Sequence, residues 1–174
     1  MIEQYSEFAS RLNRLGSGDR AALRRSAGDM LEHADGRALT VFYRCLPNNI
    51  PAYQEGKWFA VACLRCLWDA GDEGSESLPE LLCNMRSQEL LSDSVVHRVE
   101  ILMDTPWDQD GYMLKKLYRL IVLVRQKNGA ILSFQELLAD LLGWNWENQQ
   151  IQRKWARTIF GTKLTVKGEE NDAD

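Results

Sequence analysis

Apolar residues recur at the spacing of an α-helix along almost the whole chain, and no segment alternates with a period of two for long. The first apolar stripe runs from Ile2 to Leu15, and the last places Ile151, Trp155 and Ile159 four residues apart. The segment from about 55 to 69 is apolar on most sides, which is typical of a central helix. We predict an all-α fold, a compact bundle of about eight or nine helices that could divide into two helical halves.

Turn and capping residues divide this pattern into separate helices. Ser17 or Asp19 is expected to cap a short second helix. Two S-x-x-E sequences have the spacing of a capping box, Ser77 with Glu80 and Ser133 with Glu136. Further helices are predicted over about 37–45, 55–69, 93–104, 108–128 and 148–160.

A length of 174 residues fits one ordinary domain with a real core. We therefore predict a single helical domain over 1–163. The sequence GDEGSE at 71–76 is the best loop in the chain and a candidate boundary between two halves. Residues 164–174 are acidic and too polar to bury, so this tail is expected to be disordered.

Several classes of protein lack support in the sequence. No stretch approaches the roughly 18 to 20 consecutive apolar residues of a membrane span. The N-terminus lacks the pattern of a signal peptide, so a cytoplasmic location is expected. Motifs for a nucleophilic serine, a zinc protease or a phosphate-binding loop are also missing. We expect no catalytic residue, no cofactor and no small-molecule substrate.

Four cysteines, at 45, 63, 66 and 83, lie in apolar runs rather than at the spacing of a disulfide scaffold. Cys63 and Cys66 form a C-x-x-C sequence, but a structural zinc site usually needs a second ligand pair. We interpret these thiols as core residues and expect no metal site. A metal-dependent enzyme built on Cys63, Cys66, Cys83 and His97 is a remote alternative.

The net charge of −4 argues at first against a nucleic-acid partner, but acids and bases are segregated along the chain. Between Asp69 and Asp110 there are eleven acids and two bases, Arg86 and Arg98. Three basic windows contain Arg11, Arg14, Arg20, Arg24 and Arg25 beside one acid; Lys115, Lys116, Arg119, Arg125 and Lys127 with none; and Arg153, Lys154, Arg157 and Lys163 with none. A solvated helix face would explain any one window, whereas three suggest a shared surface for a polyanion.

Helical spacing places these cations in groups of two or three, a turn apart. Arg20 and Arg24 share a face with Arg25 beside them, and Arg153 and Arg157 are likewise four residues apart. Such groups suit adjacent phosphates rather than base edges, so they would bind a backbone without reading its sequence.

Residues 137–144, LLADLLGW, and 151–160, IQRKWARTIF, resemble the C-terminal signature of the CasB family, the small subunit of the type I-E CRISPR Cascade complex. That signature is D-L-x-x-W, then a basic pair, W-A and a closing aromatic residue. Residues 19–25, DRAALRR, are similar to the family's N-terminal element. The family pattern differs at Pro79, where glycine is usual, at His97, where arginine is usual, at Tyr118, which is often basic, and at Ser133, where aspartate is common.

The resemblance implies a non-catalytic subunit that works beside other Cascade subunits and as a dimer. It implies binding of the phosphate backbone in the R-loop of crRNA and target DNA, which stabilises the R-loop in antiviral defence. The expected nucleic-acid-binding residues are Arg20, Arg24, Arg25, Arg119, Arg153, Lys154 and Arg157. The alternative is a helical protein–protein adaptor that makes no contact with nucleic acid.

Overall fold

The computed structural model describes residues 2–68, 73–127 and 131–161, and this part of the chain contains nine α-helices and one short 3₁₀ helix. The helices are α1 (Ile2–Asn13), α2 (Ser17–Arg25), η1 (Leu31–His33), α3 (Gly36–Cys45), α4 (Ala52–Trp68), α5 (Leu78–Ser87), α6 (Asp93–Asp104), α7 (Tyr112–Lys127), α8 (Phe134–Leu142) and α9 (Gln150–Phe160). The predicted all-α fold is confirmed.

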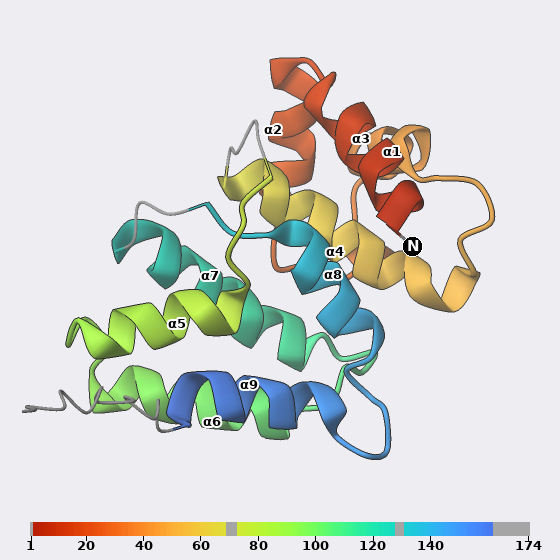
Figure 1. The fold of residues 1–174 in the computed structure, drawn as a ribbon. Helices are drawn as coiled ribbons and strands as arrows, with labels where there is room; N and C mark the ends of the chain where they lie inside the picture. The colour runs from red at the N-terminus through yellow and green to blue at the C-terminus, as the bar shows by residue number, and fades with distance from the viewer. Residues whose placement is uncertain (1, 69–72, 128–130, 162–174) are drawn as a thin grey trace, which may run out of the picture.

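Helix α4 is the central helix, as its apolar sequence predicts. Its residues from Trp58 to Cys66 are all buried, and it packs against α2, α7 and α8. Figure 1 shows α4 crossing the molecule, with α1, α2 and α3 on one side and α5, α6 and α9 on the other. A helix that is apolar on nearly every side has to be surrounded by other helices, and this one is.

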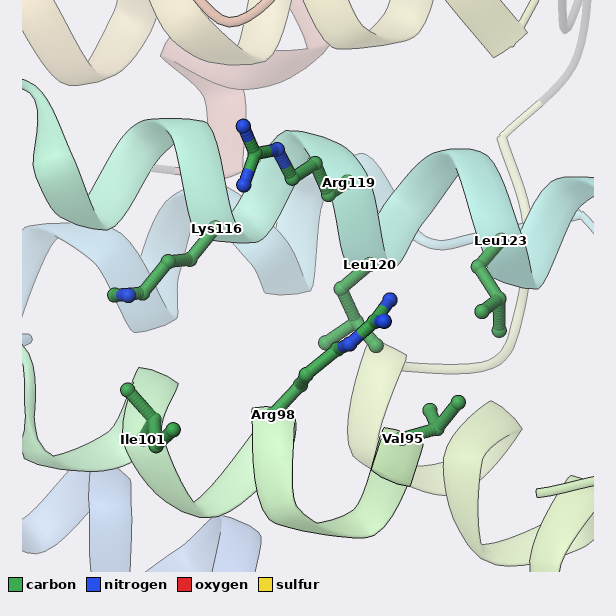
Figure 2. Close-up of a pocket in the computed structure, with 7 residues that line it drawn as sticks. All are labelled: Val95, Arg98, Ile101, Lys116, Arg119, Leu120 and Leu123. Atoms are coloured by element: carbon green, nitrogen blue, oxygen red, sulfur yellow. The ribbon is translucent and has the colours of Figure 1, made fainter. Parts of the chain in front are cut away.

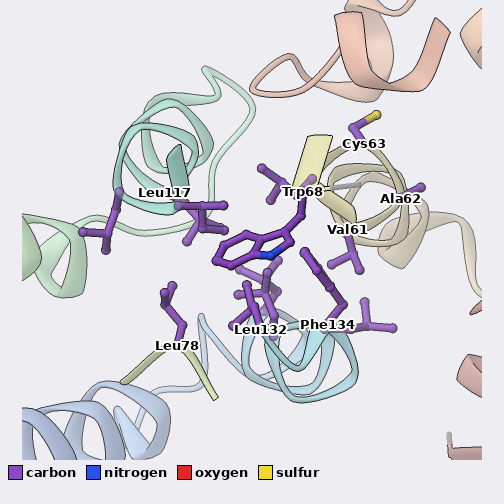
Figure 3. Packing of buried hydrophobic residues seen from close by; sticks show 14 of the residues in the cluster. Val61, Ala62, Cys63, Trp68, Leu78, Leu117, Leu132 and Phe134 are labelled. Carbon is purple, nitrogen blue, oxygen red and sulfur yellow. The ribbon is translucent and has the colours of Figure 1, made fainter. Parts of the chain in front are cut away.

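One continuous core connects the helices on both sides of the predicted boundary. Figure 3 shows Trp68 of α4 close to Phe134 of α8, with Leu78 and Leu117 nearby. The rings of Trp68 and Phe134 lie edge to face, 6.1 Å apart. The division into a domain over 1–163 and a tail remains a prediction, because 71–72 and 162–174 lie outside the described residues.

The segments before α5 and before α8 approach each other closely. Glu76 and Leu132 form an isolated parallel β-bridge, and Ser133 N–H donates to the Glu76 carbonyl at 2.8 Å. A Cβ atom at Gly74 would lie 1.8 Å from the carbonyl oxygen of Ile131, so only glycine fits there. The nearby Glu73 carboxylate accepts hydrogen bonds from the Tyr5 hydroxyl and from Gln135 N–H.

Of the two predicted capping boxes, the one at α5 forms in full, whereas the one at α8 forms only by half, because Ser133 N–H donates to the Glu76 carbonyl and not to Glu136. The Glu80 carboxylate accepts from the N–H and the hydroxyl of Ser77, at 2.7 Å each, ahead of α5. Ser133 caps α8, where its hydroxyl oxygen accepts from the N–H of Glu136 at 3.3 Å. These bonds satisfy backbone N–H groups that have no partner inside the helix.

Two predicted helix starts are wrong. The N-cap of α2 is Gly16, without a side-chain bond, and Asp19 instead forms ion pairs with Arg37 and Arg44 of α3. Helix α7 begins at Tyr112 rather than near 108, because Gly111 has a φ of +67° that ends the preceding turn.

The cysteines of the C-x-x-C sequence are core residues, as predicted. Cys63 and Cys66 are buried, as is Cys45, while Cys83 is partly exposed. Burial raises the pKa of the Cys63 thiol well above its usual value, which keeps it protonated and unreactive. Within the described ranges no group of three or more His, Cys, Asp or Glu side chains is placed to hold a metal ion. No described helix is long and apolar enough to cross a membrane.

Candidate nucleic-acid interface

The first cationic cluster lies on α2, at the end of the molecule farthest from α9 (Figure 1). Ala22 and Leu23 are buried, which turns Arg24 and Arg25 outward to solvent. Arg20 is half-buried and has an interaction within the protein, so it is less available than the other two. The helical spacing therefore predicts the exposed face correctly for Arg24 and Arg25.

Helix α3 adds two arginines to this surface that the sequence does not point to. Arg37 and Arg44 both bond to Asp19 of α2, and their side chains remain 63% and 57% exposed. Their hydrogen bonds hold the pKa of the Asp19 carboxyl below its usual value. Asp19 is the one acid in the first basic window, so α3 neutralises it and the α2–α3 surface keeps a cationic excess.

The second cluster lies between α6 and α7, where Arg98, Lys116 and Arg119 border a hollow of about 260 Å³. Figure 2 shows Arg98 reaching from α6 toward α7, on which Leu120 and Leu123 lie. Arg98 and Arg119 are exposed, and Lys116 lies 4.5 Å from the centre of the Tyr112 ring. Arg98 comes from the acidic segment of the sequence and Arg119 from a basic window. The packing of α6 on α7 places both at the border of the hollow.

Arg98 is a candidate that the site prediction lacks. It lies within the acidic segment from Asp69 to Asp110, so counting charges along the chain hides it. The signal in the sequence is the family element at His97 and Arg98, where an arginine pair is usual. His97 is exposed and lies 3.3 Å from the Glu100 carboxylate, so it does not join Arg98 in the hollow.

The third cluster lies on α9, where Arg153, Lys154 and Arg157 with Gln150 border a shallow groove of about 210 Å³. Arg153 and Arg157 are exposed on one face, as their spacing predicts. Trp155 and Ile159 are buried on another face of α9, which packs against α5, and the Trp155 indole also bonds to Asp140 of α8.

Lys154 differs from its two neighbours because it is bound to acids of α8. Its ammonium lies 2.9 Å from Asp140 and 3.3 Å from Glu136. Burial alone would lower the pKa of Lys154, but the bonds to these carboxylates outweigh burial and raise it. The Asp140 carboxylate is buried and also accepts from the indole N–H of Trp155 at 2.7 Å. Burial raises the pKa of Asp140 despite these bonds. A phosphate would therefore have to compete for Lys154.

Two further arginines, Arg65 and Arg86, form bonds that stabilise the fold. Arg65 is 2% exposed and bonds to Glu73 and to the Tyr5 hydroxyl. Arg86 donates to the carbonyl of Ile159 at 3.0 Å and lies over the Phe160 ring, so it holds the end of α9. A cation near the C-terminus of a helix is stabilising.

These features define a class: a helical bundle whose exposed cations form three separate clusters. A family model described as CRISPR-associated protein Cse2 matches residues 19–160. The chain belongs to the Cse2 family of CRISPR-associated proteins. The resemblance to CasB, seen in residues 137–160, is thereby confirmed. No curated protein matches the chain.

Solved structures agree in fold over nearly the full length. A CRISPR-associated protein of the Cse2 family from Thermus thermophilus is 27% identical, with a TM-score of 0.72 over 90% of this chain and 97% of its own. A structure described as CasB from Thermus thermophilus is 26% identical, with a TM-score of 0.73 over 92% and 97%. A chain of a CRISPR RNA-guided surveillance complex is 22% identical, with a TM-score of 0.72 over 91% and 92%, and shares the fold.

Proposed function

We propose that this protein is the small, non-catalytic subunit of a type I-E Cascade complex. In this role it binds the phosphate backbone of the R-loop formed by crRNA and target DNA, acting as a dimer beside other Cascade subunits. Membership of the Cse2 family supports the assignment to a Cascade complex, and so does the fold shared with a chain of an RNA-guided surveillance complex.

The observation that carries the phosphate contact is the set of exposed arginines without acid partners. Among the described residues, no carboxylate lies within ion-pair distance of Arg24, Arg25, Arg119, Arg153 or Arg157. Guanidinium groups form paired bonds to phosphate oxygens and suit such contacts well. Contacts of this kind read the backbone and not the bases.

The expected contribution is modest. Exchanging a DNA duplex for an RNA–DNA duplex is nearly balanced in free energy, so a few backbone contacts can decide the outcome. About three phosphate contacts on a single strand give a salt slope near −2, so fourfold more salt weakens binding by about twentyfold. This is useful inside a complex and weak for an isolated subunit.

The experiment uses the assembled complex with Arg24→Ala and Arg25→Ala combined. Target binding is expected to weaken about tenfold near 0.15 M salt, and the salt slope to flatten by about 1.4. Arg24→Lys with Arg25→Lys keeps the charge and serves as the matched control; it is expected to keep the wild-type salt slope and to lose less affinity than the alanine variant, because lysine retains the charge but not the paired bonds.

Unchanged target affinity and slope, with normal assembly, would remove the α2 cluster from the proposal. A loss of assembly with unchanged binding by complexes that do form would instead favour the helical adaptor that makes no contact with nucleic acid.

A further inference from the structure

The hollow between α6 and α7 combines an apolar interior with a cationic border. Val95 and Leu120 are each 5% exposed and form its floor, and Leu123 is half-buried beside them. Ile101 also lines the hollow and is 37% exposed. Figure 2 shows Arg98 of α6 and Leu120 and Leu123 of α7 directed into the space between the two helices. An apolar surface left open to water beside charged groups is typical of a binding site.

The cations at the border are not balanced by the protein. In the part of the chain that the structure describes, no carboxylate lies within ion-pair distance of Arg98, Lys116 or Arg119, and none lines the hollow. Helix α7 has five basic residues and no acid in sixteen positions. Like charges held this close repel one another, so an anion bound between them relieves the repulsion.

The size of the hollow indicates what its apolar part can hold. An apolar cavity of about 150 Å³ accommodates a benzene ring. The hollow here has about 260 Å³, enough for one flat nitrogenous ring system. Figure 2 shows Arg98 beside the floor residue Leu120, so its guanidinium lies next to the space where a ring would sit and is placed to bond a phosphate flanking it.

We propose that this hollow binds one unstacked base of a single-stranded nucleic acid, while Arg98, Lys116 and Arg119 hold the phosphates on either side of it. The proposal rests on the proposed function and deepens it, because it names the kind of strand that this surface takes. A duplex keeps its bases stacked inside and would reach only the three cations.

A peptide fits the same surface less well. A helix that binds in a groove needs a row of apolar contacts at i, i+3, i+4 and i+7. The hollow is a single compartment bounded by seven residues. A peptide strand would need an exposed sheet edge, and α6 and α7 offer none.

The test compares two strands of equal charge on the full-length chain in low salt. One is an eight-residue thymidine oligonucleotide, and the other has the same backbone with every base removed. Methyl signals of Ile101 and Leu123 are followed by NMR, which suits a 20.0 kDa protein and weak binding. The strand with bases is expected to bind about five- to tenfold tighter and to shift both methyl signals.

The key variant is Ile101→Gln, which makes the hollow more polar without changing its charge. It is expected to abolish the preference for the strand with bases and to leave binding of the base-free strand unchanged. The matched control is Ile131→Gln, since Ile131 is 41% exposed and lies outside the hollow. That control is expected to keep the preference. Arg98→Ala is expected to weaken both strands by the same factor.

Equal affinity for the two strands, or a preference that survives Ile101→Gln, would overturn the base site and leave phosphate binding standing. Failure of both strands to bind at millimolar concentration would also overturn it. A glutamate-rich peptide containing leucine that shifts the same methyl signals and displaces the strand would assign the hollow to a protein partner instead. The Arg24 and Arg25 variants test the proposed function separately, in the assembled complex.

Discussion

The hollow between α6 and α7 and the face shared by α8 and α9 both carry cations, but their electrostatics differ. Lys154 on α9 is bound to Asp140 and Glu136 of α8, whereas Arg98 and Arg119 have no such partner among the described residues. A cation that already holds a carboxylate has less to offer a phosphate, because the existing bonds must be shared or broken. The number of cations on a face therefore overstates its capacity to bind a polyanion.

The largest expected effect comes from removing the acid that distinguishes the α8–α9 face. Asp140→Ala leaves the indole N–H of the buried Trp155 without its acceptor. The free energy of unfolding is expected to fall by about 2–3 kcal/mol, measured by urea denaturation. Glu136→Ala removes only the exposed partner of Lys154 and is expected to cost less than about 0.5 kcal/mol. Equal losses for the two variants would contradict the structural role of Asp140.

The next prediction compares the two kinds of cation directly. Lys154→Ala is expected to lower the free energy of unfolding by about 1 kcal/mol, a reduced figure because the side chain is 43% exposed. Arg153→Ala and Arg119→Ala are expected to stay within about 0.5 kcal/mol of the wild type. For target binding by the assembled complex we expect the opposite order: Arg153→Ala and Arg119→Ala should lower the affinity for target DNA more than Lys154→Ala does. If Lys154→Ala weakened binding most and left stability unchanged, the distinction between the two regions would fail.

The smallest expected effect concerns Asp19, an acid shared by two exposed arginines. Its pKa in the folded protein lies below the ordinary value of 3.8. An acid with a lowered folded pKa adds stability above its unfolded pKa, and this contribution is lost as the pH falls through the folded value. The stability difference between the wild type and Asp19→Asn should be largest well above pH 3.8 and shrink below it. Urea denaturation across that range measures it, and a difference independent of pH would contradict the role of the Arg37 and Arg44 bonds.

The helices could be predicted from the sequence because their apolar spacing and capping boxes are local features. Ser77 and Glu80 lie three residues apart and meet in the structure as expected. Asp19 is different: it can cap a helix by sequence, but arginines 18 and 25 residues away take its carboxylate. Whether a capping residue caps its own helix thus depends on which side chains the fold brings near it.

The same limit applies to the candidate site. The spacing of Arg153 and Arg157 predicts a shared exposed face, because it depends on one helix alone. The bonds of Lys154 to α8, and the position of Arg98 and Arg119 at the border of one hollow, depend on how two helices pack. Charge counts along the chain place Arg98 in an acidic segment, although in space it lies across a hollow from α7, a helix with five basic residues and no acid.

The β-bridge between Glu76 and Leu132 fixes where the chain enters and leaves the segment formed by α5, α6 and α7. Helices α5, α6 and α7 lie between Glu76 and Leu132 in the sequence, so the bridge joins the two ends of this three-helix segment. Helices α4 and α8 pack on each other directly, without those three helices between them. The fold can therefore tolerate changes of length in the loops within the α5–α7 segment, such as the loop between α6 and α7, without moving α8 away from α4.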